Sequence, residues 1–71
     1  MTLVPGANQV RLNPTDVTNC KPVGNIHLHD SLDPRKEFRN EVVGFGGNAA
    51  IVTARTALND LPIAGVAYQC P

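Results

Sequence analysis

The sequence predicts a single α+β domain of the order β-β-α-β-β, in which one helix packs on a small, mostly antiparallel sheet and one disulfide closes the fold. Three observations predict this class. Several short segments alternate apolar and polar residues, which is typical of half-buried strands. One segment between them carries residues that start and stop a helix. Two cysteines lie near opposite ends of a chain of 71 residues, which is too short to bury a large core.

Residues 1–8 are expected to form a disordered lead or tether, because Pro5 and Gly6 interrupt them before any element can form. The remaining residues, 9–71, are expected to form the globular domain. Its predicted strands cover residues 10–12, 20–28, 48–55 and 63–70. Pro22 cannot donate a backbone hydrogen bond, so the second strand should lie at a sheet edge or contain a bulge. The third strand is rich in Ala, Ile and Val and is predicted to be mostly buried.

The helix is predicted over residues 34–45. Asp33 is expected to cap its free N–H groups, and Pro34 suits the first helical position. Ser31, the only serine, is also expected to serve in capping. The apolar stripe of the helix consists of Phe38, Val42 and Phe45. Gly46-Gly47 should end the helix, because glycine readily adopts the left-handed conformation that follows the last turn.

Cys20 and Cys70 are expected to form a disulfide, because an even number of cysteines in a small domain often supplies a covalent constraint. Closing a loop of about 50 residues would contribute roughly 4 kcal/mol on the chain-entropy model. Such a bond persists in an oxidising compartment, and we expect it to join two edges of the sheet. Two unrelated thiols are the alternative. Neither cysteine belongs to a Cys-x-x-Cys pair, which argues against redox or nucleophilic chemistry.

The charges predict no nucleic-acid partner. Six basic and six acidic side chains give a formal net charge of zero, whereas a nucleic-acid binder needs a basic face. The densest cluster alternates in sign and is expected to be the solvated face of the helix; it comprises Arg35, Lys36, Glu37, Arg39 and Glu41. The chain has no run of roughly 18 apolar residues that could span a membrane. It shows no signal peptide either, and we expect one to have been removed.

One short motif could carry metal chemistry. His27 and His29 are two residues apart at the end of a predicted strand, where residues with this spacing project to the same side, so both could reach one ion with Asp30 nearby. Because the sequence has no other histidine, two exposed imidazoles at a strand end are the preferred interpretation. No Ser/His/Asp triad or paired carboxylates stand out. We therefore expect a non-enzymatic protein without a cofactor, and a periplasmic metal-binding module is the alternative.

With these elements placed, three segments resemble a family of small proteobacterial envelope lipoproteins, domain of unknown function 4156. They are Val10-Arg11-Leu12 with Asn19-Cys20-Lys21-Pro22-Val23-Gly24, Phe38-Arg39-Asn40 with Gly46-Gly47-Asn48-Ala49-Ala50-Ile51-Val52, and Gly65-Val66-Ala67-Tyr68-Gln69-Cys70. The layout is also similar to that of the sensor lipoprotein of the Rcs envelope-stress phosphorelay.

The resemblance implies a periplasmic domain that is anchored in the outer membrane by a lipid missing from this chain. It also implies a structural, interaction or stress-surveillance role with an unknown protein partner in the envelope. The resemblance supplies no catalytic residues.

Overall fold

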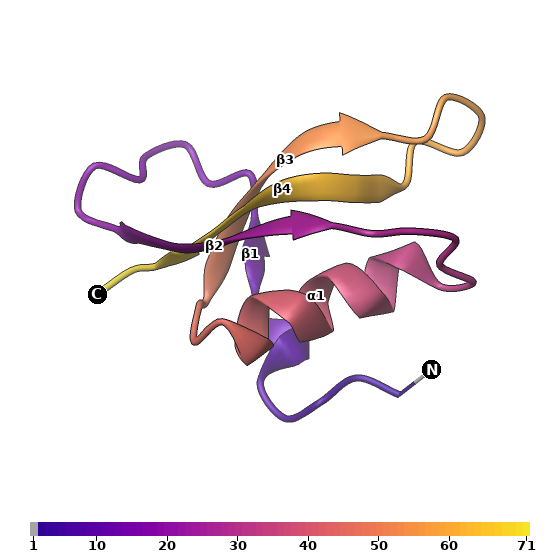
Figure 1. Cartoon of the computed structure of the whole chain (residues 1–71). Helices are drawn as coiled ribbons and strands as arrows, with labels where there is room; N and C mark the ends of the chain where they lie inside the picture. The colour runs from indigo at the N-terminus through magenta and orange to yellow at the C-terminus, as the bar shows by residue number, and fades with distance from the viewer. Residues whose placement is uncertain (1) are drawn as a thin grey trace.

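The computed structural model describes residues 2–71, which form one α-helix and a four-stranded mixed sheet and so confirm the α+β class. The elements in chain order are the 3₁₀ helix η1 (Ala7–Gln9), β1 (Arg11–Leu12), β2 (Lys21–His27), α1 (Pro34–Gly44), β3 (Ala49–Arg55) and β4 (Pro62–Gln69). Helix α1 lies across one face of the sheet (Figure 1). The strands and the helix follow the predicted order.

The strand order in the sheet is β1-β3-β4-β2. Strand β4 pairs antiparallel with β3 on one side and with β2 on the other, whereas β1 pairs parallel with β3. The last strand of the chain therefore lies inside the sheet, and β1 and β2 form its edges. The register of β2 shifts between Pro22 and Gly24. Both consequences predicted for Pro22, an edge strand and a bulge, are confirmed.

The disulfide between Cys20 and Cys70 is present, with 4.2 Å between the two Cα atoms. Cys20 precedes the edge strand β2, and Cys70 follows the inner strand β4. The expectation that the bond joins two edges of the sheet is therefore wrong. Strand β4 pairs with β3 along its other edge, so β4 is an inner strand. The disulfide instead joins the adjacent ends of the neighbouring strands β2 and β4.

The start of α1 differs in part from the prediction. Pro34 occupies the first helical position as expected, but the Asp33 side chain makes no capping hydrogen bond with the described residues. Its carboxylate lies 4.0 Å from the Nζ atom of Lys36 instead. Ser31 contributes to the helix start: its Oγ accepts a hydrogen bond from the Asp33 N–H at 3.3 Å and donates one to Glu37 Oε1 at 3.2 Å. Ser31 therefore binds the N–H of the residue that precedes the helix, and it does not take over the capping of the first turn that was predicted for Asp33.

The end of α1 agrees with the prediction. Gly46 has a φ of 82°, in the left-handed region. Its N–H donates to the Val43 carbonyl at 2.9 Å, and the N–H of Gly47 donates to the Val42 carbonyl at 2.9 Å. These two bonds form a Schellman motif, which satisfies carbonyls that the helix leaves free at its end.

The core lies between α1 and the sheet, and it depends on small residues beneath large ones. Phe38 and Val42 are completely buried, and Ala50 and Ala67 of the sheet are buried with them. A Cβ atom on Gly65 would lie 2.8 Å from Cζ of Phe38, so glycine at this position lets the phenyl ring approach the strand. Only the first two residues of β3 are buried and the last three are exposed, contrary to the expectation of a mostly buried strand.

The third member of the predicted stripe lies at the margin of the core. Phe45 is 42% exposed. A Cβ atom built on Gly24 would fall 2.4 Å from the Phe45 ring, which shows that this ring rests directly on the edge strand β2. The stripe is therefore confirmed for Phe38 and Val42, while Phe45 covers the boundary between helix and sheet.

The N-terminal segment differs from the predicted disordered lead over residues 1–8. The structure describes residues 2–8, and they pack along α1. The Asn40 side chain accepts a hydrogen bond from the Val4 N–H at 2.9 Å and donates one to the Thr2 carbonyl at 3.0 Å. Ala7 is completely buried in η1. A polar residue on the helix thus holds the segment by its backbone, a contact that composition does not reveal.

Candidate functional site

The predicted histidine pair comes together in the structure. The ring centroids of His27 and His29 are 4.4 Å apart, with the rings inclined at 60°. Both residues are exposed, and Asp30 begins the following turn with a φ of 51°. Within residues 2–71, no group of three or more His, Cys, Asp or Glu side chains is arranged to hold a metal ion. The metal site therefore stays a prediction that rests on two imidazoles.

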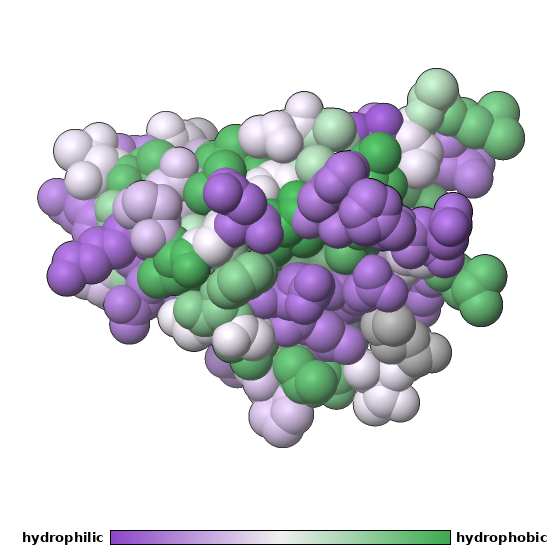
Figure 2. Space-filling model, viewed as in Figure 1, coloured by the Kyte–Doolittle hydropathy of each residue, from purple (hydrophilic) through white to green (hydrophobic). Residues whose placement is uncertain are grey.

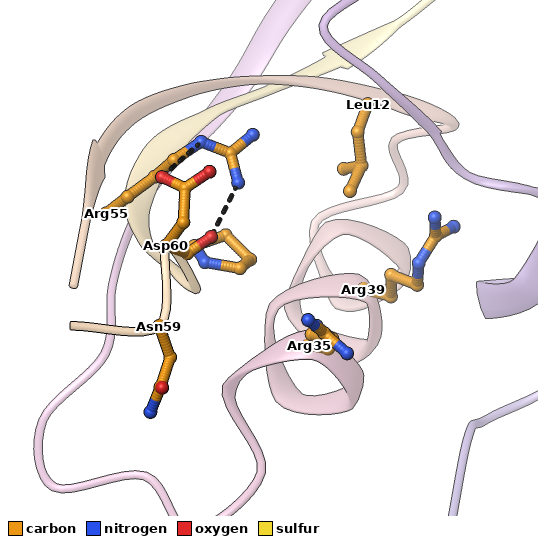
Figure 3. Close-up of a pocket in the computed structure, with 7 residues that line it drawn as sticks. Leu12, Arg35, Arg39, Arg55, Asn59 and Asp60 are labelled. Carbon is orange, nitrogen blue, oxygen red and sulfur yellow. Dashed lines mark hydrogen bonds and ion pairs between the residues drawn. The ribbon is translucent and has the colours of Figure 1, made fainter. Parts of the chain in front are cut away.

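A cavity of about 420 Å³ lies at one end of the sheet, between α1 and the β3–β4 turn. Figure 3 shows Arg55 and Asp60 on one side of it and the helix residues Arg35 and Arg39 on the other. The lining consists of Leu12, Arg35, Arg39, Arg55, Asn59, Asp60 and Pro62. Three arginines and one aspartate give this cavity a positively charged lining.

Three elements bring these arginines together. Arg35 and Arg39 are four residues apart on α1 and therefore share a helix face. Arg55 is the last residue of β3. The turn that follows is held by Thr56, whose backbone N–H donates to the Leu61 carbonyl at 2.9 Å and whose Oγ1 accepts from the Leu61 N–H at 3.0 Å. This turn positions the polar side of the cavity opposite the helix.

The three arginines differ in how far they are already engaged. Arg39 Nη1 donates to the Val10 carbonyl at 2.6 Å and to the Ala7 carbonyl at 3.3 Å, which binds the N-terminal segment to α1. Arg55 Nη1 donates to the Asp60 carbonyl at 3.1 Å, and its Nε lies 3.9 Å from the Asp60 carboxylate. Arg35 makes no hydrogen bond or ion pair with any described residue. Its guanidinium is thus the one with all donors free.

Such a lining is suited to binding an anion. A guanidinium offers five N–H donors and stays protonated in proteins, so it binds carboxylates and phosphates without exchanging a proton at neutral pH. Sequence reasoning missed this site, because it assigned Arg35 and Arg39 to a solvated helix face and did not single out Arg55 or Asn59. The available signal was the spacing of two arginines one helical turn apart on the same face.

The same end of the molecule also carries apolar loop residues. Leu58, in the β3–β4 turn, is 91% exposed, and Leu32, in the loop before α1, is fully exposed. The two loops lie at the same end of the sheet, opposite the C-terminus (Figure 1). Figure 2 shows hydrophobic side chains protruding from this end beside hydrophilic ones. The end therefore combines cationic and apolar groups.

Searches against family models, curated proteins and solved structures found no match to this chain. The resemblance to the envelope lipoprotein family therefore stays a prediction based on its motifs. Helix α1 is the longest helix in the described residues, and it is too short and too polar to cross a membrane.

Proposed function

We propose that this chain is the non-enzymatic periplasmic domain of an outer-membrane-anchored envelope lipoprotein, and that it acts by binding a partner in an interaction or surveillance role. The observation that carries the proposal is the Cys20–Cys70 disulfide, which spans a sequence separation of 50 residues. A disulfide of this kind is typical of small domains in oxidising compartments and is rare in reducing ones. The envelope location and the lipid anchor are proposed from the resemblance of the sequence motifs to the lipoprotein family.

The arginine-lined cavity supports binding over catalysis. General acid–base chemistry needs a group whose pKa lies near the working pH, and arginine does not meet this requirement. The single carboxylate of the lining, on Asp60, lies beside Arg55. The cavity is therefore better suited to holding a charged group than to transferring a proton.

The compartment is tested by trapping thiols in cells that express the full-length protein. Cells are quenched in acid, and free thiols are then tagged with a maleimide that shifts mobility on a gel. We expect no tag before reduction and two tags after it. Cys20→Ser is the matched control and should carry one tag without reduction. Two tags on the unreduced wild-type protein would contradict the proposal. Labelling of the full-length protein with an alkyne fatty acid tests the lipid anchor separately.

The second candidate function is metal binding by His27, His29 and Asp30. The close approach of the two imidazoles favours it, because imidazole nitrogen is a common ligand for zinc, copper and nickel. Each metal is titrated while the imidazole NMR signals are recorded, with His29→Ala as the control. Dedicated sites bind tightly, so the absence of any change below about 100 μM metal would eliminate this candidate.

A further inference from the structure

We propose that the cavity between α1 and the β3–β4 turn binds a phosphate group, with Arg35 and Arg55 as its principal ligands. The cavity volume of about 420 Å³ falls within the range of small-molecule sites. Guanidinium groups bind phosphate through short, charge-assisted hydrogen bonds that are about twice as strong as neutral ones. This inference is independent of the compartment and the lipid anchor proposed above.

The charge and geometry of the lining favour phosphate over carboxylate. A carboxylate is flat, singly charged and satisfied by one guanidinium that approaches in its plane. A phosphate monoester carries a charge of about −1.5 to −2 at pH 7 and three acceptor oxygens. The cavity places Arg35 and Arg55 on opposite sides, with Arg39 and the Asn59 amide also in the lining (Figure 3). Donors that come from several directions match a tetrahedral group better than a planar one.

The ion pair between Arg55 and Asp60 does not prevent Arg55 from binding a phosphate. The distance between Arg55 Nε and the Asp60 carboxylate is 3.9 Å, and the Asp60 side chain is 84% exposed. Ion pairs of this exposed kind are weak, because water and salt screen them. A bound dianion can therefore engage the other Arg55 donors while the Asp60 carboxylate turns to solvent, and the hydrogen bond from Arg55 Nη1 to the Asp60 carbonyl stays in place. Arg35 needs no release, since its donors are free within the described structure.

The phosphate could belong to a free metabolite or to a lipid headgroup. Leu58 directly precedes the lining residue Asn59, and Leu32 is three residues before Arg35. Both leucines are exposed and apolar, as side chains that enter a lipid surface need to be. Inorganic phosphate therefore tests the phosphate site itself, and vesicles of phosphatidylcholine with or without phosphatidic acid test the lipid source.

The first experiment titrates inorganic phosphate into the full chain and follows backbone and arginine side-chain signals by NMR. We expect saturable shifts at Arg35, Arg55 and Asn59. Arg35→Gln should raise the Kd about 10-fold or more, because it removes a charge-assisted donor pair. The control is Lys21→Gln, which makes the same change in net charge at the start of β2. Its Kd should stay within about twofold of wild type, apart from long-range screening effects.

The vesicle experiment identifies the source. Co-sedimentation with phosphatidic acid vesicles that is lost in Arg35→Gln and in Leu58→Ser assigns the phosphate to a lipid headgroup. Binding of inorganic phosphate that is weakened by Arg35→Gln, without co-sedimentation, assigns it to a soluble ligand. The proposal is overturned if neither probe binds, or if Arg35→Gln and Lys21→Gln weaken binding equally. An unchanged amide spectrum of Arg35→Gln shows that a loss of binding is not a loss of fold, and Arg55→Gln provides a second variant.

Discussion

The two ends of the sheet are built differently. At the end near the C-terminus, the Cys20–Cys70 disulfide joins β2 to β4, and Asn48 binds the backbone of Cys70 (Figure 1). At the opposite end, the β3–β4 turn and the loop before α1 expose Leu58 and Leu32 beside the arginine-lined cavity. One end is held by a disulfide and by side-chain hydrogen bonds to the backbone. The other end presents charged and apolar side chains to solvent. The disulfide and the proposed binding site thus lie at opposite ends of the strands.

At the disulfide-bonded end of the sheet (hereafter the stapled end), the Asn48 side chain adds hydrogen bonds beyond those of the strands. Its side-chain amide donates to the Cys70 carbonyl at 2.9 Å and accepts from the Cys70 N–H at 2.8 Å. The amide therefore acts as an additional peptide group of the β3–β4 ladder. The Asn13 side chain acts as an acceptor in a similar way beside β1, where its Oδ1 accepts a hydrogen bond from the Val52 N–H at 2.8 Å. Asparagine can replace backbone at strand ends because its amide matches a peptide group in donors and acceptors.

The largest effect should come from removing the staple. Replacing both Cys20 and Cys70 by alanine should lower the free energy of unfolding by roughly 4 kcal/mol, because the unfolded chain regains the entropy of an open loop of about 50 residues. Urea denaturation at pH 7 measures this change, with the reduced wild-type protein as a second test. A loss below about 1 kcal/mol would show that the stapled end does not depend on its disulfide.

Matched asparagine substitutions at the two ends should have smaller and unequal effects on the free energy of unfolding. Asn48→Ala removes two hydrogen bonds and leaves backbone polar groups of the buried Cys70 unpaired, so it should lower the free energy of unfolding by about 1–3 kcal/mol. Asn59→Ala, in the exposed β3–β4 turn, should change stability by less than about 0.5 kcal/mol. Thermal and urea unfolding of both variants provide the measurement. Equal losses would contradict the division between a stapled and an open end.

The smallest effect concerns pH, in the loop that leads to Cys20. The Thr18 hydroxyl, and then its backbone N–H, donate to the Asp16 carboxylate and hold its pKa below the ordinary value of 3.8. A lowered folded-state pKa gives stability that is present above about pH 4 and is lost as the pH falls through the folded value. NMR titration of the Asp16 carboxyl should show the low pKa, and Thr18→Val should raise it toward 3.8. An unchanged pKa in that variant would refute the assignment.

The helix and the strands could be predicted because their signals are local. Pro34 marks the first turn of α1, and Gly46 marks its end, since each has a backbone preference that acts within a few residues. The capping assignment at Asp33 was wrong, because the geometry of the preceding loop decides whether a side chain reaches the first-turn N–H groups, and the Asp33 carboxylate lies near Lys36 instead. The position of the N-terminal segment was missed for a related reason: Asn40 holds backbone atoms 36 and 38 residues away.

The sequence alone determined the α+β class, the element order and the pairing of two cysteines, because these follow from local periodicity, turn residues and a count of two. Only the tertiary structure decided that β1 joins β3 in parallel, that β4 lies inside the sheet, and that Arg55 and Arg35 line one cavity. Strand pairing and register are set by how side chains pack across the sheet, which no short segment contains. For that reason the disulfide could be predicted from the sequence and the arginine-lined cavity could not.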